Sequence, residues 1–282
     1  MIWWKEGVMC VQGVRFDARL TLIDSAQVFH WREQDGKFFA VVGGASVCLL
    51  PTGDGFELRG TNPEQEAFFA HYFDLTRDYS CLSSACAKYP LARQAVDALP
   101  GLRVLNQPPW EALVSFITSA NNNVGRIRKL VNGLMDRVGQ GMFPSPQCLA
   151  ETPETILREI GFGYRAPYLI ATARRVAEGF PLNELSTRSY EEAHALLLEL
   201  PGVGDKVADC VQLFSTGHAN AFPVDVWVDR LMREWFHVQA RTKRQVRQAA
   251  LEMFGANAGL IQQYLFHCAR MGLVSPGEEK PA

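Results

Sequence analysis

The segment that most constrains the fold is a short turn between two helical patterns, Leu200-Pro201-Gly202-Val203-Gly204-Asp205-Lys206. Before it, Ser189 and Glu192 have the spacing of a capping box, and apolar residues then recur at helical spacing. After it, residues 206–214 resume a helical pattern. The two glycines permit the positive φ angles of a tight hairpin. The sequence therefore predicts a helix-hairpin-helix over residues 189–214.

Such a hairpin brings main-chain N–H groups close to a phosphate oxygen at the start of a helix, where the helix dipole favours an anion. Gly202, Val203 and Gly204 are the candidate phosphate-binding residues. The motif fits a structural corner with a surface lysine equally well. Asp225, nineteen residues after Lys206, places a carboxylate near the amine and favours a catalytic site over that alternative.

The rest of the chain divides into a strand-rich part and a helical part. Residues from about 10 to 60 alternate as in antiparallel strands, with Val14, Phe16, Leu20 and Leu22 among the alternating positions. From Pro63 to about residue 271 the spacing is helical. The fold class predicted is α+β. A small N-terminal antiparallel-sheet domain with flanking helices occupies residues 1–105, and a larger helical domain occupies residues 106–282.

Charge and cysteine content restrict the partners and the compartment. The net charge of −2 weighs against a nucleic-acid partner, so any such partner would be held mainly by main-chain contacts, with a shallow salt dependence. Seven cysteines without a paired C-x-x-C spacing indicate free thiols, and neither zinc nor an iron–sulfur cluster is expected. No apolar run approaches a signal peptide or a membrane span, which favours the cytosol.

Taken in order, several segments resemble the 8-oxoguanine DNA glycosylase family of the helix-hairpin-helix DNA glycosylase superfamily. They are Ser25–Glu33, Ser115–Asn123 followed by Arg126, Gly163–Ala166, the hairpin with Asp225, and Gln262–Phe266. The resemblance spans nearly the whole chain. It implies a small antiparallel-sheet domain packed on a larger helical domain. It also implies a monomer that acts on double-stranded DNA containing 8-oxoguanine, in the cytoplasm of a bacterium or the nucleus of a eukaryote, with no membrane partner.

Lys206 and Asp225 have the chemistry that removal of a base requires. An amine that adds to the glycosidic carbon forms a covalent sugar adduct, then a Schiff base, and β-elimination can nick the strand. Lys206 can attack only when neutral, which burial and nearby positive charge favour. Asp225, expected at a helix N-terminus, could stabilise the sugar cation and orient or deprotonate the amine; alone, it would more often be a simple N-cap. The resemblance implies these two roles, in a bifunctional glycosylase and lyase without a cofactor.

The resemblance also implies a pocket for the extruded base. Oxidation at C8 turns N7 of guanine from an acceptor into a donor, so one carbonyl can recognise the lesion. The matching carbonyl belongs to Ala26, where relatives often have glycine. Cys210 and Phe266 match the positions that sandwich the base, and Gln262 the position that bonds its Watson–Crick edge. As isolated residues, Cys210 and Phe266 would more often belong to the core.

Further positions match residues that contact the DNA around the lesion. Asn121, Arg126 and Arg165 match those that address the cytosine left behind, and Tyr164 the one that intrudes into the stack. Arginine and asparagine suit a base edge because they donate in a fixed geometry. The alternative is that both arginines are solvated and that the asparagines end a helix. A second departure from the family is Trp227, where relatives commonly carry histidine.

Two other functions stay open at this point. One is a non-catalytic helix-hairpin-helix protein in which Lys206 only contacts phosphate, although such a protein has no need of Asp225 or of the Asn–Arg and Tyr–Arg elements. The other is a glycosylase for alkylated bases or oxidised pyrimidines. The alkyl-base branch usually lacks the lysine, and the pyrimidine branch usually carries four closing cysteines, of which only Cys268 could be present here.

Overall fold

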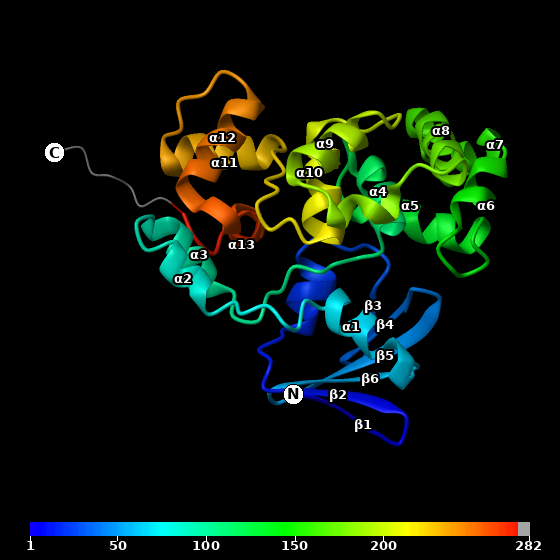
Figure 1. Ribbon diagram of the computed structural model, residues 1–282, viewed down its shortest axis with the longest axis horizontal. Helices are drawn as coiled ribbons and strands as arrows, with labels where there is room; N and C mark the ends of the chain where they lie inside the picture. Colours follow the sequence, from blue (N-terminus) through cyan, green and yellow to red (C-terminus); the bar gives the residue numbers. More distant parts are fainter. Residues whose placement is uncertain (276–282) are drawn as a thin grey trace.

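The computed structural model describes residues 1–275 of the chain, and the predicted frayed tail lies outside them except for Ser275. Its N-terminal part is one antiparallel sheet in the order β1-β2-β6-β5-β4-β3 (Figure 1). The strands are β1 (Ile2–Lys5), β2 (Val8–Gln12), β3 (Arg32–Gln34), β4 (Lys37–Val42), β5 (Ala45–Thr52) and β6 (Gly55–Arg59). The predicted antiparallel sheet is confirmed, and the Asp35-Gly36 turn joins β3 to β4.

One stretch of the predicted strands is helical instead. The alternation from Val14 to Leu22 leads into a π-helical segment, η1 (Leu20–Asp24), so the strand prediction is wrong there. The cause is Asp17, whose side chain accepts a hydrogen bond from the Leu20 N–H at 2.8 Å and whose carbonyl accepts one from the Thr21 N–H at 2.9 Å. Both bonds begin a helical turn, and Leu22 enters the core under the sheet. Strand β1 also lies outside the predicted range.

The remainder is helical, as predicted. The helices are α1 (Glu66–Tyr72), α2 (Cys81–Ala85), α3 (Pro90–Ala98), α4 (Pro109–Ser119), α5 (Val124–Arg137), α6 (Pro146–Glu151), α7 (Glu154–Ile160), α8 (Ala166–Ala177), α9 (Tyr190–Leu198), α10 (Asp205–Val211), α11 (Val226–Phe236), α12 (Lys243–Phe254) and α13 (Ala258–Met271). A π-helical segment, η5 (Gln212–Thr216), continues α10. The combination of a small antiparallel sheet and a larger helical body confirms the predicted fold class.

Two hydrophobic cores hold these parts together. The smaller core lies under the sheet. There, Phe69 and Tyr72 of α1 pack on strand residues, together with Phe73, which directly follows the helix. The larger joins the helices from α4 to α13, and α2 and α3 belong to it as well, because α3 packs against α13 (Figure 1). The division at residue 105 stays a prediction, although these two helices precede it and share the core of the helices that follow it.

A single extended segment, residues 102–107, passes between the two cores. Leu102 and Val104 are buried in the helical core, whereas Leu105 is buried under the sheet. The Asn106 N–H donates to the Tyr72 carbonyl at 2.9 Å, and the Gln107 N–H donates to the Phe214 carbonyl at 2.7 Å. This segment therefore fixes the sheet relative to the end of the hairpin's second helix.

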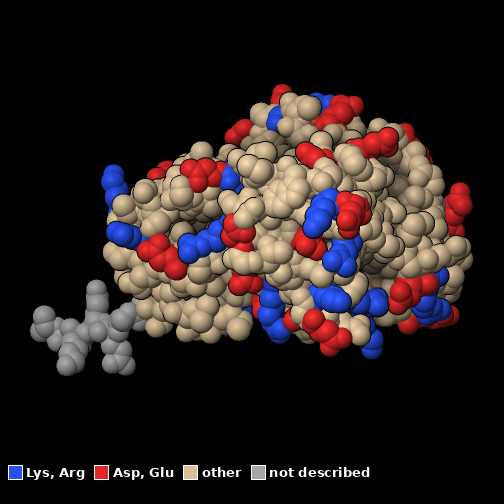
Figure 2. Space-filling model, turned by 90° about the horizontal axis from the view of Figure 1, so that it is seen from below, with Lys and Arg blue, Asp and Glu red and all other residues tan. Residues whose placement is uncertain are grey.

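The surface does not show a broad field of one sign on the sheet side of the molecule. Figure 2, seen from that side, shows lysine and arginine interspersed with aspartate and glutamate. This distribution fits the small net charge of the chain. Among residues 1–275, no helix is both long enough and apolar enough to span a bilayer.

Candidate active site

The helix-hairpin-helix forms where it is predicted. Helix α9 begins with the Ser189–Glu192 capping box, and Gly202 has a φ of +79°. A Cβ at Gly202 would lie 2.8 Å from the Cβ of Tyr168, so the turn needs glycine for both its conformation and its packing. The prediction of a positive φ at Gly204 is wrong. It is extended, with φ −111° and ψ −179°, because it is the N-cap of α10.

The site around the hairpin's open end suits a close approach by another molecule. A Cβ at Gly204 would meet no atom within 4 Å, and Gly202 and Gly204 are both exposed, whereas Val203 is buried. The space beside the N-cap of α10 is therefore open. This is the geometry on which the proposed phosphate contact depends.

Lys206 lies in the first turn of α10 and is half-buried. Its Nζ donates a hydrogen bond to the Ser119 Oγ at 2.8 Å, and lies 5.4 Å from the centre of the Phe116 ring. Ser119 and Phe116 both come from α4, so the lysine side chain contacts a helix outside the hairpin. Ser119 lies within a segment that resembles the family, but a role for it at the site was not predicted.

Cys210 and Asp225 complete the surroundings of the amine. Asp225 is the N-cap of α11, and its Oδ1 accepts a hydrogen bond from the Val228 N–H at 2.8 Å. The predicted helix N-terminus is confirmed. Burial raises the pKa of the Cys210 thiol to about 11, while the nearby Lys206 lowers this pKa and the Asp225 carboxylate raises it. Both the amine and the carboxylate therefore act on this thiol, which lies one helical turn after the lysine on α10.

The predicted base-binding residues come from two distant segments. Ala26 follows η1 and has a φ of +60°, and Gln262 and Phe266 lie one turn apart on α13. Gln262 is 5 % exposed, and its Oε1 has no hydrogen-bond partner among the described residues. A buried amide oxygen without a protein partner is uncommon in folded proteins, and this one is available to a hydrogen-bond donor. Phe266 is half-buried, with the Arg270 guanidinium 5.8 Å from the centre of its ring.

The four residues predicted to contact the opposite base and the stack form one cluster. The Asn121 Nδ2 donates to the Tyr164 hydroxyl at 3.3 Å, and the Arg126 guanidinium donates to the Gly161 carbonyl at 3.2 Å. Asn121, Arg126 and Tyr164 are exposed. Arg165 differs from the solvated arginine of the alternative interpretation, since it is only 4 % exposed.

Arg165 instead braces the end of α4. Its Nε donates to the Ala120 carbonyl at 2.9 Å, and its terminal nitrogen donates to the Asn121 carbonyl at 3.0 Å. The guanidinium also lies over the Tyr164 ring, 4.4 Å from its centre. Asn121 has a φ of +49°, a conformation that asparagine tolerates better than most residues. Arg165 therefore holds both Asn121 and Tyr164 in place.

A buried polar cluster behind the hairpin was not predicted. Asp209 is 1 % exposed and accepts a hydrogen bond from the Tyr190 hydroxyl. His194 contacts that hydroxyl through Nδ1 at 3.0 Å and Asp205 through Nε2 at 3.0 Å, and the Arg247 Nε lies 3.6 Å from Asp209. Burial raises the pKa of Asp209 to about 7. The cluster ties both hairpin helices to α12, and nothing in its sequence spacing indicated this.

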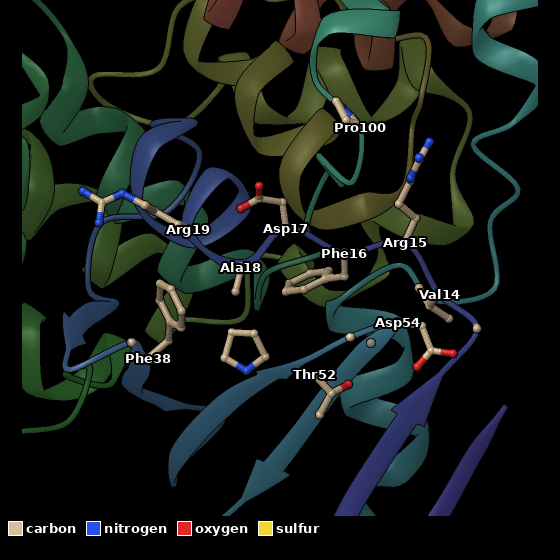
Figure 3. Close-up of a pocket in the computed structure, with 15 residues that line it drawn as sticks. Val14, Arg15, Phe16, Asp17, Ala18, Arg19, Phe38, Thr52, Asp54 and Pro100 are labelled. Atoms are coloured by element: carbon tan, nitrogen blue, oxygen red, sulfur yellow. The ribbon is translucent and has the colours of Figure 1, made fainter.

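Two cavities elsewhere on the molecule contain none of the predicted residues. One of about 660 Å³ lies between residues 13–19, the turn from β5 to β6 and Pro100, as Figure 3 shows. The other, of about 480 Å³, lies between β4, β5 and the end of α5. The candidate site is therefore separate from both, on the hairpin, α4, α11 and α13.

Trp227 is 58 % exposed in the first turn of α11, next to Asp225. This departure from the family thus puts an exposed aromatic ring, rather than an imidazole, two residues after the predicted catalytic carboxylate.

The comparisons with known proteins agree with this arrangement. Residues 9–113 match the model of the 8-oxoguanine DNA glycosylase N-terminal domain, and residues 114–255 match the model of the HhH-GPD superfamily of base excision DNA repair proteins. Together the two models cover the sheet apart from β1 and the start of β2, the hairpin and the helix that follows Asp225. The chain belongs to the 8-oxoguanine DNA glycosylase family.

Individual relatives support the same family. A probable N-glycosylase/DNA lyase of Methanothermobacter thermautotrophicus is 34 % identical over 239 residues, which cover 74 % of this chain and 75 % of the relative. The N-glycosylase/DNA lyase of Saccharomyces cerevisiae is 36 % identical over 50 % of this chain and 43 % of its own. The 8-oxoguanine glycosylase/lyase of Clostridium acetobutylicum, solved with double-stranded DNA containing cytosine opposite 8-oxoguanine, is 32 % identical with a TM-score of 0.89 over 97 % of this chain and 99 % of its own.

Proposed function

We propose that this protein excises 8-oxoguanine opposite cytosine from double-stranded DNA and then nicks the strand by β-elimination. The observation that carries the proposal is the Lys206 amine at the start of the hairpin's second helix, which donates to Ser119 at 2.8 Å. The Asp225 carboxylate caps α11, and both charges act on the Cys210 thiol one turn after the lysine. The family membership supports it, as do the names of the relatives. We infer that the enzyme works where the DNA is, in the bacterial cytoplasm or the eukaryotic nucleus.

In this mechanism the Lys206 Nζ attacks C1′ of the extruded nucleotide. The bond from C1′ to N9 breaks as the bond from Nζ to C1′ forms, and the departing base takes up a proton. Asp225 stabilises the positive charge that develops on the sugar, because its Oδ1 is fixed by the α11 N-terminus. Ser119 orients the amine before the attack through its 2.8 Å hydrogen bond. The adduct opens to a Schiff base, and loss of a C2′ proton expels the 3′ phosphate.

Recognition of the base is assigned to the groups that have no protein partner. The Ala26 carbonyl accepts from the N7–H that only the oxidised base has, and the buried Gln262 amide bonds the Watson–Crick edge. Cys210 and Phe266 lie on the two faces of the ring. Opposite the lesion, Asn121 and Arg126 address cytosine, and Arg165 supports this contact by holding Asn121 in place. Tyr164 fills the gap in the stack, and Gly202 to Gly204 hold a phosphate.

The experiment is borohydride trapping on duplexes that contain 8-oxoguanine opposite each of the four bases. Wild type should form a covalent complex and cleave fastest opposite cytosine, and Lys206→Gln should do neither. Lys88→Gln, which changes an exposed lysine, is the matched control and should behave as wild type. A cross-link that persists in Lys206→Gln contradicts the assignment of the nucleophile. Binding without cleavage of any duplex by wild type would instead support a non-catalytic DNA-binding protein.

A further inference from the structure

The peptide group between Ala26 and Gln27 lies between two peptide groups that are each held by a buried glutamine side chain. The Gln263 Nε2 donates to the Ser25 carbonyl at 2.7 Å, and the Gln107 Nε2 donates to the Gln27 carbonyl at 2.8 Å. Both donor side chains are 2 % exposed. The peptides before and after the Ala26–Gln27 peptide are therefore fixed from opposite sides, one by α13 and one by the segment that crosses between the cores.

The side chain of Gln27 anchors the same turn to a third place. Its Oε1 accepts from the Leu105 N–H at 2.8 Å, and its Nε2 lies 2.8 Å from the Arg103 carbonyl and 3.0 Å from the Ser25 Oγ. Gln27 is fully buried. Since a buried amide bonded on both ends resists rotation, the turn cannot shift without breaking several hydrogen bonds.

The peptide between these anchors has both of its polar groups free. Within residues 1–275, neither the Ala26 carbonyl nor the Gln27 N–H has a hydrogen-bond partner. Ala26 is also held at a φ of +60°, where an L-residue is strained. A conformation of this kind persists only where its surroundings determine it, and the three glutamines are those surroundings.

The orientation of this peptide decides which base the pocket accepts. With the carbonyl towards the base, it accepts from the N7–H of 8-oxoguanine. If the peptide turned over, the Gln27 N–H would take its place and would donate to N7 of ordinary guanine. The two peptide orientations therefore favour opposite bases. Gln263 is also the neighbour of Gln262 on α13. The same helix therefore sets the distance between the Ala26 carbonyl and the Gln262 amide, which bonds the Watson–Crick edge of the base.

We propose that Gln263, Gln107 and Gln27 are positioning residues that set the selectivity for 8-oxoguanine over guanine by fixing the orientation of the Ala26–Gln27 peptide. The inference rests on the proposed function, because it concerns the pocket assigned there. None of the three side chains needs to touch the base.

Gln263→Met tests the proposal, because methionine keeps the length of the side chain and removes the donor to the Ser25 carbonyl. Single-turnover rates are measured on duplexes with 8-oxoguanine, guanine or an abasic site opposite cytosine. The ratio of the 8-oxoguanine rate to the guanine rate should fall by about tenfold or more. The abasic-site rate, which needs no base recognition, should change far less. Gln107→Met, which frees the Gln27 carbonyl on the other side, should lower the same ratio.

Gln212→Met is the matched control, since Gln212 is equally buried but its side-chain nitrogen and oxygen have no hydrogen-bond partner among the described residues. It should keep the wild-type ratio. Unchanged selectivity in both folded Gln263 and Gln107 variants overturns the inference, and so does an equal loss of rate on all three duplexes, which would indicate a general structural role. Wild type without activity on 8-oxoguanine would overturn the proposed function itself, so the two failures are distinguishable.

Discussion

Ala26 occupies a backbone conformation that suits glycine, which relatives often have at this position. Its φ of +60° costs an L-residue roughly 1 kcal/mol relative to glycine. We expect Ala26→Gly to raise the free energy of unfolding by about 0.5–1 kcal/mol, as measured by urea denaturation. Ala171→Gly, a change inside α8, should instead lower it by about 1 kcal/mol. A loss of stability in Ala26→Gly would show that the strain is not present in solution.

Arg165 and Arg126 serve the same predicted purpose but differ in burial, which makes them a matched pair. Lysine at 165 cannot reproduce the donors that reach the Ala120 and Asn121 carbonyls, so Arg165→Lys should lower both the unfolding free energy, by about 1–2 kcal/mol, and the preference for cytosine. Arg126→Lys, at an exposed site, should lower the preference with little change in stability. Thermal unfolding and cleavage opposite cytosine and adenine measure the two effects. Equal stability of the two variants would contradict the bracing role.

At this scale the sequence predicts residues whose roles are local and misses those whose roles depend on distant partners. Asp225 was expected at a helix N-terminus, because Pro-x-Asp is a local signal, and it is an N-cap. Ser119 and Gln263 carry no such signal. Their partners, Lys206 and Ser25, lie far away in the chain, and only the fold brings them together.

The hairpin contains two glycines that the structure uses for different purposes, and a matched pair of variants separates them. Gly202→Ala places a Cβ 2.8 Å from that of Tyr168 at a positive φ, so it should destabilise the protein by about 1–3 kcal/mol. Gly204→Ala meets no neighbour and has an extended backbone, so its stability should stay within about 1 kcal/mol of wild type.

DNA binding should distinguish the same two variants. The Cβ added at Gly204 lies where the phosphate would approach, so Gly204→Ala should weaken binding of an abasic-site duplex by about tenfold although it stays folded. Fluorescence anisotropy at fixed salt measures this loss. Full affinity in Gly204→Ala would contradict a phosphate contact at this turn.

For single helices, the periodicity of apolar residues is sufficient to predict the secondary structure. The capping box and the helices around the hairpin follow the pattern closely, since capping and burial of one face act within a single helix. The strand prediction for Val14 to Leu22 is wrong because alternation over a few residues also fits one helical turn. The hydrogen bond that the Asp17 side chain accepts from the Leu20 N–H stabilises the helical turn.

For the whole molecule, the succession of strands and helices predicts the fold class, but not which core each helix joins. Helices α2 and α3 follow the sheet in sequence, yet α3 packs against α13, which lies far along the chain, and α2 packs on α3. An apolar helix face requires a partner without specifying one, because hydrophobic burial is not directional. The sequence likewise does not indicate that Glu111 of α4 is buried where the sheet meets the helices.

Glu111 and His30 face each other at that junction, with 3.8 Å between Oε2 and Nε2. Burial raises the pKa of Glu111 to about 8, and a main-chain hydrogen bond from Gly43 opposes this effect without overcoming it. Burial lowers the pKa of His30 to about 4. The carboxyl group is thus protonated in the folded protein at neutral pH, whereas it would be ionised in the unfolded chain.

These pKa values predict how stability depends on pH. A carboxyl group with a raised pKa stabilises the fold below its unfolded pKa, and this contribution is lost as pH rises towards the folded value of about 8. His30 acts in the opposite sense, but only between about pH 4 and 6.5, and the raised pKa of Asp209 acts up to about 7. From pH 7 to 8, below the range in which unfolded thiols ionise, the unfolding free energy should therefore fall by about 1 kcal/mol, mainly through Glu111.

Glu111→Gln keeps the shape of the side chain and removes its titration, so urea denaturation at pH 7 and pH 8 should show most of this fall abolished. Its stability at pH 8 should exceed that of wild type, since the amide avoids burial of a carboxylate whose Oε2 lacks a hydrogen-bond partner within residues 1–275. Glu178→Gln, at an exposed position on the end of α8, should retain the wild-type fall. An equal fall in wild type and Glu111→Gln would mean that the carboxyl group ionises freely, and that the junction between the sheet and the helices is open to water.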